Sequence, residues 1–199
     1  MTEPKDASWK EKLGGSFELM LLFGRGIAPF EKGGKKAALQ SMWIPVIMFP
    51  LGMISAYLYP PEGLEKQPVQ TVMAITALSG VLMFAAGVAL LWLFADVMKR
   101  RDRFWIPFQA GNWVGIPLSI IGLPVLFAAY GHFWPREQMD HVLMAITYYG
   151  VLINACLMFR GLKIDWEWAG FFACMSVFVS QQIWNGLFWL YDVPIKWGL

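Results

Sequence analysis

Five long stretches of this chain contain no Asp, Glu, Lys or Arg. They cover residues 37–61, 67–95, 104–135, 141–159 and 168–191. An α-helix rises 1.5 Å per residue, so about 20 residues cross the ~30 Å hydrocarbon core of a bilayer. Each stretch is long enough for one crossing and too short for two crossings and a turn. The predicted membrane spans are 38–59, 70–95, 107–131, 141–159 and 168–190.

The composition agrees with a membrane protein. Hydrophobic residues make up 57% of the chain and charged residues only 15%, whereas a soluble domain carries roughly a quarter charged residues. These values exclude a water-soluble globule, a disordered chain and a nucleic-acid binder. The runs are continuously apolar rather than alternating, which favours helices over a membrane barrel. We therefore expect an all-α, polytopic transmembrane bundle.

The Lys and Arg residues predict how the bundle is oriented. Thirteen of the 16 fall in the segment before the first span and in the loops after the second and fourth spans. Positively charged loops stay in the cytoplasm. The N-terminus is therefore expected inside and the C-terminus outside, which requires an odd number of spans. The loops are short and there is no organelle signal, which is compatible with the inner membrane of a bacterium.

The chain divides into four predicted regions. Residues 1–15 are expected to form a disordered cytoplasmic tail, and 16–36 a short amphipathic segment at the membrane interface. Ser16 could cap a helix there and Gly24 could end it; this segment either lies flat on the inner leaflet or packs against the bundle. Residues 37–191 form the five-helix domain, and 192–199 a short outer tail.

Two parts of the chain resemble each other and suggest a tandem repeat. Residues 73–82 read Met-Ala-Ile-Thr-Ala-Leu-Ser-Gly-Val-Leu, and 144–152 read Met-Ala-Ile-Thr-Tyr-Tyr-Gly-Val-Leu. Trp43 and Trp113 are each followed by an Ile-Pro pair at a similar offset. The pattern fits two duplicated hairpins plus a fifth helix, and parallel repeats of that kind occur in transporters. Coincidence within a small apolar alphabet is the alternative.

Polar residues inside the predicted spans are the candidate functional positions. They are Gln109, Asn112, Thr147, Asn154, Gln181, Gln182 and Asn185. Thr147 and Gln181 lie at similar predicted depth, so an interhelical hydrogen bond between them would be worth about 0.6 kcal/mol. Holding helices together is the favoured role for these residues, and lining a substrate path is the alternative.

A second set of residues faces the expected cytoplasmic surface, where anionic lipid headgroups attract basic side chains. The candidate headgroup contacts are Lys32, Lys35, Lys36, Lys99, Arg100, Arg101 and Arg103. No catalytic motif, metal-binding spacing or cofactor motif is present. His132 and His141 flank one loop and cannot face each other across the core as haem ligands would. Cys156 and Cys174 are expected to be buried small side chains rather than a redox pair.

The segment 107–117, Pro-Phe-Gln-Ala-Gly-Asn-Trp-Val-Gly-Ile-Pro, follows a basic loop. It resembles the polar entry, ending in proline, to a middle span of the Yip1-type integral membrane proteins. The resemblance extends as a pattern over about residues 16–190 and implies a five-span fold with a cytoplasmic N-terminal region. The Asp-Leu-Tyr-Gly-Pro type motif of eukaryotic members is missing. The resemblance is therefore to bacterial members, and it transfers no functional residue.

Three functions fit these observations. The first is a non-catalytic membrane protein that organises the bilayer or supports partner membrane proteins, with the lipid bilayer, other membrane proteins or a second copy as partners. The second is a small solute transporter with a site between the spans, favoured by the repeat and the internal prolines. The third is a membrane-embedded enzyme acting on lipid, with the basic residues 99–103 steering phosphates. We expect the first, without enzymatic activity, metal or cofactor.

Overall fold

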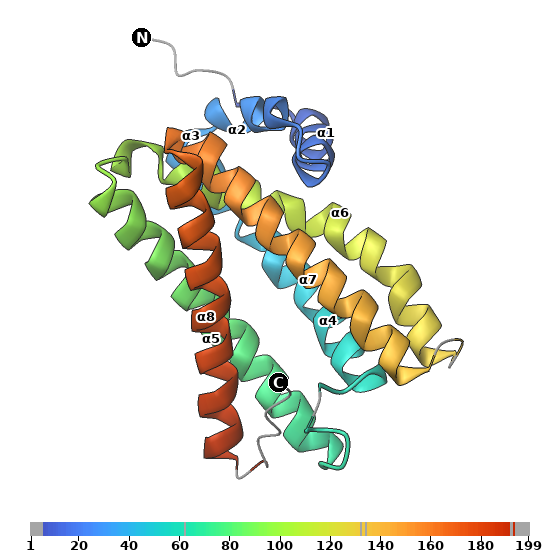
Figure 1. The fold of residues 1–199 in the computed structure, drawn as a ribbon. Helices are drawn as coiled ribbons and strands as arrows, with labels where there is room; N and C mark the ends of the chain where they lie inside the picture. The colour runs from blue at the N-terminus through green and yellow to red at the C-terminus, as the bar shows by residue number, and fades with distance from the viewer. Residues whose placement is uncertain (1–5, 62, 132, 134, 192, 194–199) are drawn as a thin grey trace.

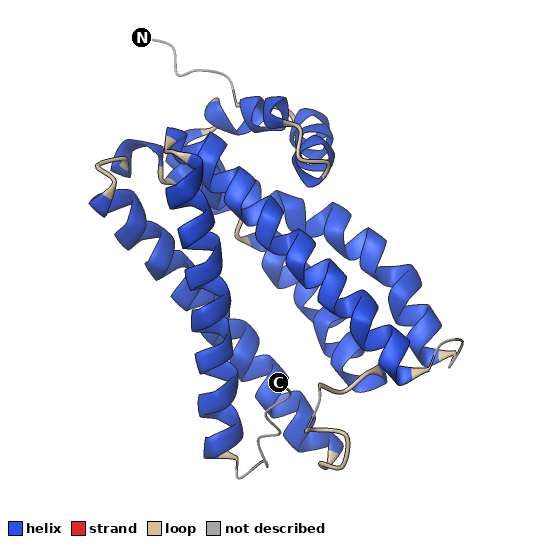
Figure 2. Cartoon of the chain, viewed as in Figure 1, coloured by secondary structure: helices blue, strands red, loops and turns tan. Residues whose placement is uncertain are grey.

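The structure is a computed structural model that describes residues 6–61, 63–131, 133, 135–191 and 193. Every secondary-structure element in these residues is helical (Figure 2). Five helices are long: α4 (Trp43–Leu58), α5 (Val69–Val97), α6 (Trp105–Tyr130), α7 (Arg136–Met158) and α8 (Trp166–Leu190). The short elements are α1 (Trp9–Met20), η1 (Gly24–Ile27), α2 (Ala28–Glu31), α3 (Gly34–Gln40), η2 (Arg101–Arg103) and η3 (Phe159–Lys163).

The long helices run up and down as a bundle, and each lies beside helices far from it in the sequence. α4 packs against α5 and α6, α6 against α7, and α8 against both α5 and α7. The helices α1, α2 and α3 gather at one end of the bundle, which we call the α1 end (Figure 1). The connections from α5 to α6 and from α7 to α8 lie at the same end.

Each long helix overlaps one of the five predicted spans, but two begin elsewhere than predicted. α4 begins at Trp43 rather than residue 38, because residues 34–40 form the separate helix α3, and α7 begins at Arg136 rather than residue 141, so its first turns carry charged residues. Four helices are long and apolar enough to cross a membrane: Gly34–Leu58, Val69–Val97, Arg101–Ala128 and Glu137–Lys163. The chain is therefore an integral membrane protein by length and composition. α8 is also 25 residues long but is not among these four, and it carries Gln181, Gln182 and Asn185. Whether α8 crosses the membrane is taken up with the proposed function.

The N-terminal segment differs from its prediction. The predicted disordered tail contains the first two turns of α1, because Ser8 and Glu11 form a capping box: Glu11 N–H donates to Ser8 Oγ at 3.3 Å, and Ser8 N–H to Glu11 Oε2 at 2.7 Å. Ser16 is not a cap but a buried helix residue whose hydroxyl donates to the Leu13 carbonyl oxygen at 2.7 Å. Residues 1–5 and 194–199 of the predicted tails lie outside the described residues.

The end of α1 also differs from its prediction. Gly24 does not terminate the helix. Leu22 adopts a left-handed conformation with φ 62°, and the Phe23 N–H donates to the Glu18 carbonyl oxygen at 2.8 Å. These bonds satisfy carbonyl groups that the helix end would leave open. The chain then turns back so that η1 lies against α1.

α1 packs on the bundle and also keeps an apolar surface. Leu19 and Met20 are buried against α6 and α7, and Tyr149 Oη donates to the Met20 carbonyl oxygen at 2.5 Å. Leu21 and Phe23 are more than half exposed. The two alternatives for this segment, packing on the bundle or meeting the membrane interface, are therefore compatible with one structure.

Two groups of buried side chains hold the bundle together. The larger cluster lies towards the α1 end and joins α1, α2, α3 and the four helices α5, α6, α7 and α8, with Phe30, Phe94, Phe104, Phe108 and Phe172 among its members. The smaller cluster lies at the opposite end, where Val72 and Ile75 of α5 pack with Leu187 of α8. The candidate site borders the larger cluster, whose members Leu91, Phe108 and Phe172 line it.

Candidate functional site: a cleft between four helices

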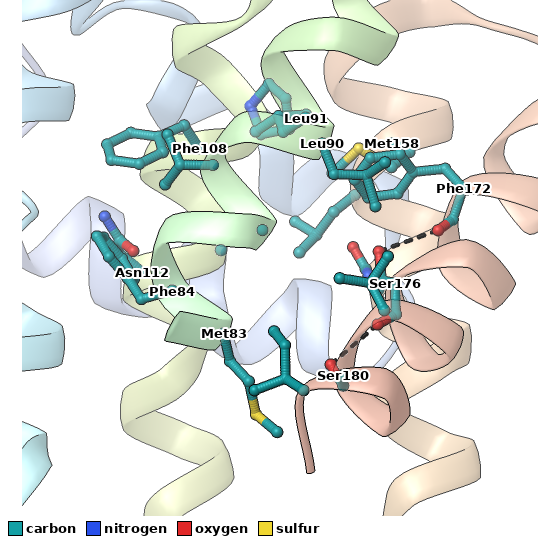
Figure 3. Close-up of a pocket in the computed structure, with 18 residues that line it drawn as sticks. Met83, Phe84, Leu90, Leu91, Phe108, Asn112, Met158, Phe172, Ser176 and Ser180 are labelled. Atoms are coloured by element: carbon teal, nitrogen blue, oxygen red, sulfur yellow. Dashed lines mark hydrogen bonds between the residues drawn. The ribbon is translucent and has the colours of Figure 1, made fainter. Parts of the chain in front are cut away.

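A cleft of about 310 Å³ opens between α5, α6, α7 and α8 (Figure 3). Its walls are mostly apolar, with Phe84, Phe108 and Phe172 among the lining side chains. Gly87 and Gly111 also line it, and a Cβ added to either glycine would meet no other atom within 4 Å. The small residues therefore leave space that a larger side chain or a bound molecule could fill.

Polar groups in the cleft are few and partly occupied. Ser176 Oγ donates to the Phe172 carbonyl oxygen and Ser180 Oγ to the Ser176 carbonyl oxygen, both at 2.9 Å (Figure 3). Serines bonded in this way to the preceding turn of their own helix keep only acceptor capacity for a ligand.

Asn112 uses its amide to join helices. Its Nδ2 donates to Ser41 Oγ at 2.9 Å, and Ser41 Oγ donates to the Ala38 carbonyl oxygen at 2.6 Å. This chain of bonds links α6 to the segment between α3 and α4. The role expected for Asn112, holding helices together, fits this contact.

Asn154 is the most available polar group of the cleft. It is half-buried and lines the cavity from α7, and in the described part of the chain its side chain has no hydrogen-bond partner. Among the residues that the structure describes, no charged side chain lines the cleft. The cleft therefore suits an apolar molecule that presents one polar group, and it offers no acid, base or metal ligand of its own.

The other predicted intramembrane residues lie elsewhere. Gln109 on α6 is fully buried, and its Oε1 and Nε2 have no hydrogen-bond partner within the described residues. The expected bond between Thr147 and Gln181 does not form. Thr147 Oγ1 donates to the Leu143 carbonyl oxygen at 2.9 Å, and Gln181 Nε2 to Asn185 Oδ1 at 3.3 Å. Gln181 and Gln182 are both exposed.

The predicted headgroup contacts differ in how strongly the protein engages them, and Lys32 Nζ lies 3.9 Å from Glu11 Oε1. Lys32, Lys35 and Lys36 line a broad basin beside α3, and Lys35 Nζ lies 5.7 Å from the centre of the Trp105 ring. Arg103, in contrast, is turned inward. Its Nη2 lies 2.5 Å from Glu31 Oε1, and its side chain is only 17% exposed. Arg101 pairs with Asp96 at 2.5 Å.

The sequence analysis did not select Ser176 and Ser180, and it was wrong about the burial of one cysteine. Ser176 and Ser180 are four residues apart, so both lie on one face of α8; that spacing was readable from the sequence. Cys156 is buried as expected, but Cys174 is exposed. Within the described residues no three His, Cys, Asp or Glu side chains gather as a metal site would need. His132 lies outside them.

Searches with protein-family models, curated protein sequences and solved structures find no match to this chain. The resemblance to the Yip1-type family therefore stays a prediction.

Proposed function

We propose that this chain is a non-catalytic integral membrane protein that organises the surrounding bilayer by holding one hydrocarbon chain of a lipid in the cleft between α5, α6, α7 and α8. The observation that carries the proposal is the cleft itself. It is open and lined mostly by apolar side chains, and three of its four helices, α5, α6 and α7, are long and apolar enough to cross a membrane. Proteins leave few empty voids of this size. In a bilayer the hydrocarbon chains of the surrounding lipids would therefore fill the cleft.

The polar groups of the cleft fit the same ligand. Asn154 can donate and accept hydrogen bonds, and the serine oxygens can accept them. A hydroxyl, amide or ester group of a lipid could bond to Asn154 while its chain lies against Phe84, Phe108 and Phe172. A polar solute would find few partners there, which disfavours the transporter alternative.

The proposal includes the full topology: five spans, the α1 end in the cytoplasm, and placement in a bacterial inner membrane. The length of α8 supports the fifth span, since 25 residues extend about 37 Å. Its position supports it too, because α8 packs along α5 and α7, which are candidate spans. Most basic residues lie at the α1 end, as the positive-inside rule requires. α5 and α7 run in the same direction (Figure 1), which is compatible with a parallel repeat.

Tagging both ends tests this topology. A reporter fused after residue 199 is expected to be active only outside the cytoplasm, and one fused before residue 1 only inside. A truncation after residue 163 provides the matched control, because it removes α8 and should return the C-terminal reporter to the cytoplasm. Two full-length fusions that report from the same side would contradict the fifth span.

Filling the cleft tests the lipid proposal. We expect Gly87→Leu combined with Gly111→Leu to lower the amount of lipid that copurifies in mild detergent by several-fold, since the two leucines occupy the volume that the lipid chain would take. Native mass spectrometry of the purified protein measures the retained lipid. Because the added side chains enter open space, the variant should still fold.

Gly150→Leu is the matched control. A Cβ there also meets nothing within 4 Å, but Gly150 does not line this cleft, so its retained lipid should equal that of the unchanged protein. Equal lipid retention in both variants would contradict the proposal. Saturable uptake of a polar solute by reconstituted vesicles, lost on filling the cleft, would replace it with the transporter alternative.

A further inference from the structure

The face of α8 that points away from the cleft carries a regular pattern. Successive residues of an α-helix turn by about 100°, so residues 174, 178, 181 and 185 lie roughly 140–200° from the cleft-lining Ser176. With Phe171 they form a series spaced three and four residues apart: Phe171, Cys174, Phe178, Gln181 and Asn185. We call this series the outer seam of α8. That spacing is typical of a helix that packs along another helix at a small crossing angle.

Nothing in the described chain covers the outer seam. Phe171 is 52% exposed and Phe178 57% exposed. Cys174 and Gln181 are also exposed, whereas Asn185 is half-buried. α8 uses its opposite face for the chain's own packing, through Ala169, Phe172 and Leu187. In a bilayer the apolar members of this face could lie against lipid, as exposed apolar residues of the other long helices do, so the amides distinguish the outer seam.

Amide side chains in the outer seam are costly when they face lipid. Gln181 Nε2 donates to Asn185 Oδ1 at 3.3 Å within the helix, a long bond that leaves the second N–H of Gln181 and its oxygen unused. An amide facing hydrocarbon without partners is unfavourable by several kcal/mol, because lipid chains offer no hydrogen bonds. Amides on transmembrane helices therefore bond across helix interfaces.

We propose that the outer seam of α8 joins two copies of this chain into a parallel dimer. This proposal rests on the fifth span of the proposed function. All copies insert in the same direction, so a two-fold axis along the membrane normal brings each residue of the seam opposite the same residue at the same depth. The interface must then be complementary to itself. An amide meets that requirement, because Gln181 of one copy can donate to Gln181 of the other and accept from it.

The charge pattern of α8 is compatible with a second copy. Residues 168–191 contain no Asp, Glu, Lys or Arg, so the seam has no charge that calls for an opposite charge on another protein, and none that would repel an identical copy. Its apolar members, Phe171 and Phe178, can pack against their own symmetry mates. Small Cys174 lies between them and lets the two helices approach closely.

Cys174 provides a direct test in native membranes. In a Cys156→Ser background, oxidation with copper phenanthroline is expected to convert most of the protein to a disulfide-linked dimer, since the two Cys174 thiols face each other across the axis. Each disulfide releases two protons and passes two electrons to the copper complex. A Cys156→Ser, Cys174→Ser, Phe178→Cys variant should also cross-link. The matched control carries its single cysteine at Ser176 on the cleft-lining face and should not.

The amide is tested separately. Gln181→Leu should lower the dimer association constant about tenfold, since each of the two symmetric bonds contributes roughly threefold. Single-molecule photobleaching of labelled protein diluted in vesicles measures it. Asn154→Leu is the matched control, since it removes an amide from the cleft on α7 and not from the outer seam, and it should change the association constant little. An equal loss in both variants, or cross-linking from Ser176→Cys as strong as from Cys174, would overturn the seam.

The topology reporters distinguish the two ways in which the experiment could fail. If the C-terminal reporter stays in the cytoplasm, the fifth span is wrong and the dimer proposal falls with it. If the reporter lies outside and Cys174 does not cross-link, the dimer alone is wrong. Cross-links from Cys174 to a different membrane protein would assign the seam to that partner and reject the second copy.

Discussion

Gly26→Ala is expected to detach the N-terminal helices from the bundle. A Cβ at this position would lie 2.4 Å from the Gly15 carbonyl oxygen and 2.8 Å from the Leu19 nitrogen. Both obstacles are backbone atoms, so no side-chain rotation relieves the clash. Overpacking against side chains already costs roughly 1–3 kcal/mol, and we expect the alanine to cost at least about 3 kcal/mol. α1 and η1 must then separate.

Limited trypsin digestion of the protein in mild detergent measures this separation. In the variant, Lys12 should be cleaved much faster than in the unchanged protein, because in the unchanged protein its side chain is buried and pairs with Asp6 at 2.7 Å. The same change at Gly14 is the control. No atom lies within 4 Å of a Cβ there, and alanine favours a helix interior over glycine. Equal protection of the Gly26→Ala variant would show that this contact does not hold the segment.

The long helices were predictable because their limits depend on local chemistry. The fifth was expected at 168–190 and is α8, Trp166–Leu190. A charged residue such as Glu167 limits an apolar run in the sequence, and this limit does not depend on where the neighbouring helices lie. The same reasoning did not establish the number of spans. α8 contains Gln181 and Gln182 and is not among the four helices that are apolar enough to be candidate spans.

The N-terminal helices were harder to predict, for two different reasons. The capping box of Ser8 and Glu11 is a short-range signal and was readable from its spacing. The contacts that then fix α1 are not. Tyr149 is 129 residues from Met20, and nothing local to either predicts their hydrogen bond. The docking of α1 on the bundle emerges only once α6 and α7 are placed.

Only part of the candidate site was predictable from the sequence. Of the seven polar residues selected inside the predicted spans, Asn112 and Asn154 line the cleft. The other five do not: Gln109 is fully buried, and the remaining four lie elsewhere on α7 and α8, namely Thr147, Gln181, Gln182 and Asn185. The selection used only the depth of a side chain along its helix and not the direction in which the side chain points. The cleft itself depends on the relative positions of four helices.

Arg103→Met is the second change with a large expected effect. Arg103 Nε donates to the Gly161 carbonyl oxygen at 2.8 Å, and Nη2 pairs with Glu31 Oε1 at 2.5 Å. One side chain thus joins α2, η2 and η3 at the α1 end. Hydrogen bonds to charged groups contribute about 1.5–3 kcal/mol when removal strands a partner. Glu31 is partly exposed and also lies 3.7 Å from Lys163 Nζ, so we expect a loss of about 2–3 kcal/mol.

Thermal unfolding in detergent measures this loss, with an expected fall in Tm of roughly 4–12 °C for a chain of this size. Arg101→Met is the matched control, since it removes one positive charge from the same loop. Arg101 is 59% exposed and pairs with Asp96, and exposed pairs contribute about 0–1 kcal/mol. Each variant removes one of the positive charges that orient this loop in the membrane. A difference in Tm between the two variants therefore reports the contacts of Arg103. Equal falls in Tm would instead show that the loop acts through its charge alone, and that α2 is not held to the bundle by Arg103.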